Sequence, residues 1–299
     1  MIHSISYFQA VVMGLLQGVT ELFPVSSLGH GVLVPGLLGW HNLVNSQSHS
    51  ESFFLAFLVG LHVGTALALL VFYRKTWTNL VRGLFRQGSL AREHGVSLLW
   101  KIDDTRTDAS YRLLVLLVLA TIPVGIVGLA FEHKLRVLFV KPLAAAIFLT
   151  INGVILMVGE LLRRRVGKHA ATIDMANLSV PRAVGIGTTQ IASLFAGISR
   201  SGVTMVSGLM SSLDHEESAN FAFLLATPVI LLAGLLKIPD LFGSLGDGVR
   251  GQAFVGALCA GLAAYVSVKF LTRWFTTKTL WPFAIYSFVF GLACIVRFA

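Results

Sequence analysis

Six apolar stretches, each about 20 residues long, constrain this chain more than any other feature of its sequence. They lie at about 53–73, 112–131, 142–162, 218–236, 253–271 and 281–297. A helix of about 20 apolar residues crosses roughly 30 Å of hydrocarbon. Hydrophobic residues make up 55% of the chain and charged residues 12%, a balance that disfavours a soluble domain of this length. The sequence therefore predicts an all-α integral membrane protein forming one polytopic domain over residues 1–299.

Basic residues are concentrated in two of the connections and predict the topology. They are Arg74, Lys75, Arg82, Arg86, Arg92, Lys101, Arg106 and Arg112 in the first connection, and Arg163, Arg164, Arg165, Lys168 and Arg182 in the second. Because cytoplasmic loops are enriched in Lys and Arg, both connections should be cytoplasmic. The N-terminal segment and the C-terminus should then lie outside. The net charge of +9 therefore reflects membrane topology, and no nucleic-acid partner is expected.

Two further apolar regions, about 7–40 and 183–213, are interrupted by residues that do not continue a helix comfortably. The interruptions read FPVSSLGH at 23–30 and AGISRSGVT at 196–204. Irregular backbone at membrane depth is tolerated only where protein or a water-filled cavity satisfies its polar groups. We therefore expect two re-entrant helical hairpins that enter from opposite sides. This predicts inverted-topology repeats, with approximate halves 1–135 and 136–299.

The first interrupted region carries residues suited to acid, base or nucleophilic chemistry. Gln17 and Glu21 are four residues apart and share one helix face. Ser26, Ser27 and His30 follow within nine residues and add hydroxyl groups and an imidazole. Two alternatives remain open: Glu21 could lie at the interface and reach water, and the serines could serve only as helix caps.

The second interrupted region carries residues suited to binding phosphate. Ser199, Arg200, Ser201 and Gly202 stand at the start of the expected helix, followed by Thr204. Ser26 of the first region is expected to join them in binding the phosphate. Free N–H groups at helix N-termini attract anions, and the guanidinium fork matches phosphate oxygens. The alternative is that Arg200 pairs with a buried acid such as Glu21.

Other polar residues in the apolar stretches have simpler interpretations. His62 is expected to be a hydrogen-bonded core histidine, although a supporting role near the first interrupted region stays open. Asn152 and Asn220 are expected to make hydrogen bonds between helices. Glu160 is expected to form a surface ion pair with Arg163 or Arg164.

Four stretches resemble the undecaprenyl-diphosphate phosphatase family, also called the bacitracin-resistance protein family. They are QGVTELFPVSSLGH at 17–30, AGISRSGVT at 196–204, FAFLLATP at 221–228 and WPFAIYSF at 281–288. The resemblance covers nearly the whole chain in order. It implies a membrane enzyme with two re-entrant hairpins that converts undecaprenyl diphosphate to undecaprenyl phosphate and inorganic phosphate. That reaction recycles the lipid carrier for peptidoglycan synthesis and confers bacitracin resistance.

The resemblance also implies roles for individual residues. Glu21, Ser27, His30 and Arg200 would be catalytic, and Glu21 with Gln17 would hold a divalent cation, Mg²⁺ or Ca²⁺. The protein would lie in the bacterial plasma membrane with its site facing outside, acting on a polyprenyl diphosphate lipid. A homodimer stays open.

Departures from the family pattern and one rival function also stay open. Many members have Glu where this chain has Gln17, Pro at Ala196, Gln at His62 and Glu at Asn220, and the loss of a carboxylate at position 17 weakens the metal prediction. The candidate nucleophile is Ser27, deprotonated or oriented by His30; the rival assignments make His30 the nucleophile or let it activate a water. A lipid-phosphate transporter or flippase could use the same phosphate site, because transporters also build sites from paired broken helices.

Overall fold

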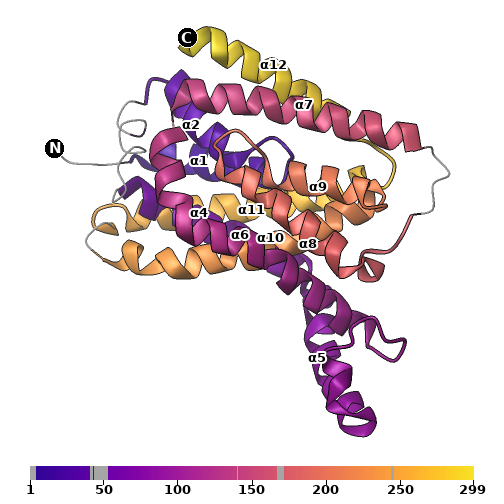
Figure 1. Cartoon of the computed structure of the whole chain (residues 1–299). Helices are drawn as coiled ribbons and strands as arrows, with labels where there is room; N and C mark the ends of the chain where they lie inside the picture. The colour runs from indigo at the N-terminus through magenta and orange to yellow at the C-terminus, as the bar shows by residue number, and fades with distance from the viewer. Residues whose placement is uncertain (1–4, 41–42, 44–52, 140, 167–171, 244–245) are drawn as a thin grey trace.

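The computed structural model describes residues 5–40, 43, 53–139, 141–166, 172–243 and 246–299. Within those ranges every regular element is helical (Figure 1). The α-helices are α1 (Tyr7–Thr20), α2 (Ser27–Leu37), α4 (Phe53–Phe72), α5 (Arg74–His94), α6 (Ala109–Phe139), α7 (Pro142–Val166), α8 (Val180–Thr189), α9 (Arg200–Met210), α10 (His215–Phe242), α11 (Arg250–Trp274) and α12 (Trp281–Phe298). Short 3-10 helices occupy Val96–Leu99 (η1), Met175–Asn177 (η2) and Gln190–Leu194 (η3). The predicted all-α fold class is confirmed.

In the described part of the chain, five helical segments are long and apolar enough to cross a membrane. They are Ala109–Phe131, Pro142–Arg165, His215–Gly234, Arg250–Trp274 and Trp281–Phe298, and each contains or overlaps an expected span. The sixth expected span coincides with α4, of which Gly60–Phe72 counts as a shorter apolar helix. Six spans and two re-entrant hairpins therefore stay a prediction.

The two halves of the bundle pack in a corresponding way. Helix α1 packs along α11, and α8 packs along α6. Both contacts depend on glycine: a Cβ atom at Gly18 would lie 2.2 Å from the Ala260 carbonyl oxygen, and one at Gly187 would lie 1.9 Å from that of Ala120. Small residues let helix backbones approach closely in membranes. Each helix–break–helix segment is followed by long helices of the bundle, α4 and α6 after the first segment and α10 and α11 after the second. This order is compatible with the predicted repeats, whose halves stay a prediction.

The described parts of both basic connections lie toward the same end of the bundle. In Figure 1 the C-terminal end of α7 and the whole of α5 lie toward the right, whereas the C-terminus lies toward the left. This arrangement agrees with the predicted opposite sides for the basic connections and the C-terminus. Lys168, in the second connection, lies outside the described residues.

Glu160 differs from the sequence expectation, and the predicted surface ion pair is wrong. Its side chain is buried, His215 Nε2 lies 2.7 Å from Glu160 Oε1, and the Leu280 N–H donates to that oxygen over 2.6 Å. A buried carboxylate needs such partners because solvent cannot stabilise its charge. Asn220 makes the expected interhelical contact by accepting a 2.7 Å hydrogen bond from the Tyr73 hydroxyl group.

Candidate active site

Two interruptions of helical structure, which we call the first and the second break, precede the two short helices that carry the predicted site residues. Residues 21–26 separate α1 from α2, and residues 195–199 separate η3 from α9. Ser26 Oγ accepts a hydrogen bond from Gly29 N at the start of α2, and Ser199 Oγ accepts one from Gly202 N at the start of α9. In both N-caps a serine side chain satisfies a free backbone N–H group. Ser27 and Arg200 are consequently the first residues of their helices.

Hydrogen bonds fasten the two breaks to each other. Ser26 Oγ also accepts from Gly197 N over 3.2 Å, and the Ser201 hydroxyl donates to the Phe23 carbonyl oxygen over 3.3 Å. Asn152 of α7 joins both, because its Oδ1 accepts from Ser199 N at 2.9 Å and its Nδ2 donates to Pro24 O at 3.0 Å. The structure thus brings together two segments about 170 residues apart in the chain.

Glu21 is the centre of the polar cluster formed by these breaks. Arg200 Nη2 donates to Glu21 Oε1 over 2.9 Å. Ser27 Oγ donates to Glu21 Oε2 over 2.5 Å, and Gln17 Nε2 donates to the same oxygen over 3.0 Å. The Glu21 side chain is 7% exposed and that of Arg200 is 11% exposed. The carboxylate therefore has a hydroxyl, an amide and a guanidinium as partners while almost excluded from solvent.

His62 reaches the same carboxylate from α4. Its Nε2 lies 3.9 Å from Glu21 Oε2, and its Nδ1 lies 2.8 Å from the Leu58 carbonyl oxygen. Because a carbonyl oxygen only accepts, Nδ1 carries a proton and Nε2 points toward Glu21. The interpretation of His62 as a supporting residue near the first break agrees with this geometry.

His30 lies close in sequence but makes different contacts. Its Nδ1 lies 2.8 Å from the Ser26 carbonyl oxygen and its Nε2 lies 2.8 Å from the Tyr286 hydroxyl group. The imidazole stacks against the rings of both Tyr286 and Phe290 and is only 2% exposed. Both ring nitrogens thus have partners other than Ser27, so the serine and histidine are not brought into contact as a nucleophile and base.

The predicted phosphate-binding serines and threonine make mostly internal contacts. Ser26 and Ser199 cap helices, Ser199 and Ser201 share a 3.1 Å hydrogen bond, and Thr204 Oγ1 donates to the Arg200 carbonyl oxygen over 2.7 Å. The N–H group of Gly202 is bonded to Ser199 Oγ. Ser26 holds the start of α2 and the others hold the start of α9, while Arg200 donates to Glu21.

Sequence reasoning missed the site roles of Tyr286 and Asn152. Tyr286 lies within the WPFAIYSF stretch that carries the family resemblance, but nothing in its spacing connects it to His30, 256 positions away. Asn152 was expected to bond between helices, and its Nδ2 donates to the Ser287 hydroxyl group of α12 over 3.4 Å. Its signal was an amide inside an apolar stretch. That it joins both breaks depends on tertiary structure.

The donor set around Glu21 suits a hard divalent cation only in part. Mg²⁺ binds through one or two carboxylates plus phosphate oxygens, and Ca²⁺ also takes amide carbonyls. Glu21 supplies one carboxylate, and the Gln17 amide oxygen is adjacent because the amide nitrogen bonds Glu21. Among the described residues no group of three His, Cys, Asp or Glu side chains gathers. Substrate oxygens would have to complete any coordination sphere.

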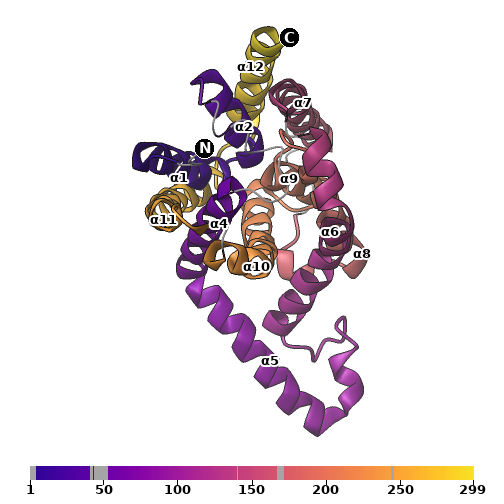
Figure 2. The same cartoon turned by 90° about the vertical axis from the view of Figure 1, so that its left-hand side faces the viewer.

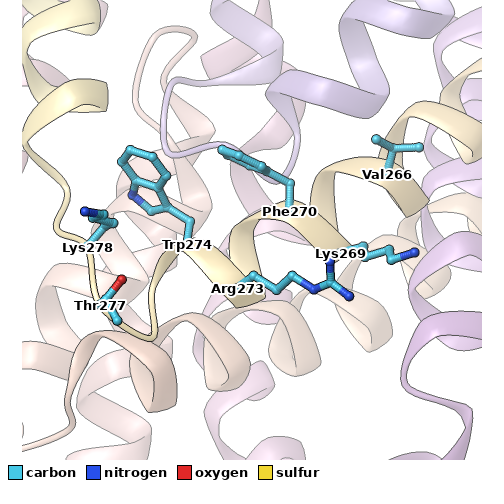
Figure 3. Close-up of a pocket in the computed structure, with 7 residues that line it drawn as sticks. All are labelled: Val266, Lys269, Phe270, Arg273, Trp274, Thr277 and Lys278. Atoms are coloured by element: carbon cyan, nitrogen blue, oxygen red, sulfur yellow. The ribbon is translucent and has the colours of Figure 1, made fainter.

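A different hollow lies at the C-terminal end of α11 (Figure 3). It measures about 430 Å³ and is lined by Val266, Lys269, Phe270, Arg273, Trp274, Thr277 and Lys278. The Phe270 ring, which lines the hollow, stacks on Phe23 of the first break at 5.9 Å. Neither Glu21 nor Ser27 nor Arg200 lines it, and we therefore assign the candidate active site to the Glu21 cluster.

Fold and site together define a class: a multi-pass helical membrane protein with a buried arginine–carboxylate–serine cluster between two broken helical segments. The chain matches the family described as Bacitracin resistance protein BacA over residues 10–293. It is 47% identical to Undecaprenyl-diphosphatase 2 of Frankia alni, covering 99% of both chains. It is 48% identical to Undecaprenyl-diphosphatase of Mycolicibacterium paratuberculosis, covering 99% of this chain and 98% of that one. The chain therefore belongs to the Bacitracin resistance protein BacA family.

Proposed function

We propose that this protein hydrolyses undecaprenyl diphosphate to undecaprenyl phosphate and inorganic phosphate, the activity that the names of its relatives describe. The observation that carries the proposal is the Arg200–Glu21–Ser27 cluster. A guanidinium that can bind phosphate oxygens stands beside a hydroxyl group whose proton already points to a carboxylate. These are the groups that phosphoryl transfer through a serine nucleophile requires.

In the proposed reaction, Arg200 turns from Glu21 to the terminal phosphate of the substrate and stabilises the charge that develops there. Ser27 Oγ attacks the terminal phosphorus atom while its proton passes to Glu21. The bond to the bridging oxygen breaks, and undecaprenyl phosphate leaves. Water then hydrolyses the phosphoserine and releases inorganic phosphate. Glu21 rather than His30 is the proposed base because it accepts the Ser27 hydrogen bond.

A divalent cation is part of the proposal. Glu21 and Gln17 would hold Mg²⁺ or Ca²⁺ beside the substrate phosphates, and the ion would neutralise part of their charge. The Arg200 guanidinium already neutralises Glu21. We therefore expect the ion to bind together with the substrate rather than before it.

The polyprenyl chain has an apolar hollow next to the proposed nucleophile. Leu28, the neighbour of Ser27, lines a cavity of about 240 Å³ together with residues of α6, η3 and α10, among them Val124, Leu194 and Leu232. Such mostly apolar cavities accept hydrocarbon ligands. The proposed location is the bacterial inner membrane, with the cluster facing the outer side, in keeping with the predicted cytoplasmic placement of both basic connections.

The test is release of inorganic phosphate from a polyprenyl diphosphate by purified protein in detergent with Mg²⁺. Ser27→Ala, Glu21→Gln and Arg200→Ala should each reduce the rate at least about hundredfold, because each removes a group that acts on the reacting phosphate. Ser97→Ala and Arg182→Ala, which change exposed residues of the same types, should keep the wild-type rate. No phosphate release by folded wild-type protein would refute the proposal.

A lipid-phosphate transporter is the second candidate, favoured by the two broken segments that face each other. Measuring movement of a fluorescent polyprenyl phosphate across proteoliposomes separates the two functions. Loss of phosphate release in Ser27→Ala with lipid movement retained would assign both activities to the chain. Lipid movement without phosphate release in the wild type would replace the enzyme by the transporter.

A further inference from the structure

The segment from Arg74 to Asp108 leaves the helix bundle and is not used by the proposed active site. Helix α5 and the returning chain form a hairpin that extends away from the bundle in both views (Figures 1 and 2). We call residues 74–108 the basic hairpin. Both of its ends join helices of the bundle, since only Tyr73 separates α5 from α4 and α6 begins at Ala109.

One face of α5 is packed against the returning chain and gives the hairpin a defined shape. Leu80, Gly83, Gln87 and Ala91 are buried on this face. Gln87 Nε2 donates to the Leu98 carbonyl oxygen over 3.0 Å, and Gln87 Oε1 accepts from Asp108 N over 2.9 Å. Arg86 pairs with Asp108 at 2.7 Å, and this hydrogen bond holds the pKa of the Asp108 carboxyl group below its ordinary value.

A second face of α5 is apolar and uncovered. Val81, Leu84 and Phe85 are 50%, 47% and 73% exposed, and their spacing of three and four residues places them on one strip of the helix. On the returning chain Val96 and Trp100 are 66% and 82% exposed. Large apolar side chains gathered in this way mark a surface that another apolar phase covers.

The charge around this strip is positive. At 3.6 residues per turn, Arg74 and Arg92 fall at the two ends of the strip that contains Val81. Three of the four acidic residues of the hairpin, Asp103, Asp104 and Asp108, are paired with Arg112, Arg106 and Arg86, and the fourth is Glu93. Among the described residues, Lys75, Arg82 and Arg92 form no ion pair. The surface therefore combines an apolar strip with cations that lack acidic partners.

We propose that the exposed face of the basic hairpin lies on the cytoplasmic leaflet and binds anionic phospholipid headgroups, with Phe85 and Trp100 inserted among the upper acyl chains. Amphipathic helices with this combination bind at the lipid interface. The cytoplasmic leaflet carries negative lipids that attract polybasic segments beside membrane helices. Attachment to α4 and α6 keeps the hairpin at that surface. The proposal does not depend on the hydrolytic activity.

The test uses the full chain in nanodiscs, which leave both membrane faces open to solvent. A nitroxide spin label is attached at Phe85→Cys on the apolar strip or, as the matched control, at Glu93→Cys on the polar side, both in a chain carrying Cys259→Ala and Cys294→Ala. The depth of the nitroxide in the membrane is obtained from its collision rates with oxygen, which concentrates among the acyl chains, and with a nickel chelate, which stays in water. In discs containing phosphatidylglycerol, the label at 85 should be about tenfold less accessible to the chelate than the label at 93.

Charge is tested separately. Replacing Lys75, Arg82 and Arg92 with Gln should abolish the increase in protection at position 85 that phosphatidylglycerol produces over phosphatidylcholine. The control removes three cations elsewhere, with Lys269→Gln, Arg273→Gln and Lys278→Gln in the hollow of Figure 3, and should keep that increase. Equal chelate access at 85 and 93 in phosphatidylglycerol would overturn the proposal. Protection at 85 with spin–spin broadening, independent of lipid charge, would also overturn it in favour of contact between copies of the chain.

Discussion

At the scale of single residues, the site is organised around one carboxylate. Glu21 has Gln17, Ser27 and Arg200 as direct partners and His62 at 3.9 Å. The sequence predicted that Gln17 and Glu21 share a helix face, and their 3.0 Å hydrogen bond confirms it. Both readings of Arg200 fit this arrangement: it pairs with Glu21 in the structure, and it is placed where a phosphate could take over that bond.

The separation of His30 from Ser27 gives the first prediction. The His30→Gln variant should release phosphate at least about tenfold faster than the Ser27→Ala variant. The reason is that His30 contacts Ser26 O and Tyr286 rather than the proposed nucleophile. Rates of phosphate release for both variants, compared at equal protein concentration, check this. If His30→Gln is as inactive as Ser27→Ala while still folded, His30 takes part in the chemistry directly.

The second prediction concerns Tyr286. Tyr286→Phe removes the hydroxyl group that donates to His30 Nε2 and leaves a buried nitrogen without a partner. The loss should be about 1–3 kcal/mol of stability, seen as a lower thermal unfolding midpoint in detergent. Tyr7→Phe is the control, because Tyr7 is 56% exposed. Equal midpoints for the two variants would show that the Tyr286–His30 bond contributes little.

At the scale of elements, the breaks depend on backbone geometry as well as on caps. Gly197 has φ of +113°, and a Cβ atom there would lie 2.4 Å from the Ala145 carbonyl oxygen. Ser26, in the first break, has φ of +70°, which is uncommon for a residue other than glycine. The sequence located both breaks through Pro, Gly and Ser; it did not show that Ser26 Oγ would bond the backbone of the other break.

The third prediction follows from Gly197. Gly197→Ala should cost about 1–3 kcal/mol from backbone strain alone, with a further cost from the clash, and should reduce phosphate release although no proposed catalytic group changes. Unfolding midpoints and rates measured together check this. Gly185→Ala in α8 is the matched control, since a Cβ atom there meets nothing within 4 Å. Unchanged stability in Gly197→Ala would show that the second break relaxes easily.

At the scale of the whole molecule, the long apolar helices agree with the spans expected from hydropathy, to within a few residues at most ends. The basic hairpin was anticipated only as a cytoplasmic connection. Its helix follows a pattern that is visible in the sequence, with Val81, Leu84 and Phe85 on one strip, but its extension away from the bundle is a property of the fold (Figure 2).

The fourth prediction is the topology. In a chain carrying Cys259→Ala and Cys294→Ala, a membrane-impermeant maleimide should label Ala299→Cys in spheroplasts, whose plasma membrane is intact and accessible to the reagent. Ser97→Cys should be labelled only after the membrane is opened, because positively charged connections stay in the cytoplasm. The opposite labelling pattern would reverse the orientation and place the site on the cytoplasmic side.

The sequence by itself determined the fold class, the positions of the long helices and the two breaks, because apolar length, charge placement and Pro, Gly and Ser signals act over a few turns of chain. It also named most members of the site. The tertiary structure alone decided which of them meet. Glu21 receives Arg200 from 179 positions away, and His30 receives Tyr286 from 256 positions away. Such pairings depend on how the helices pack, and a local sequence pattern cannot predict which distant residue becomes a neighbour.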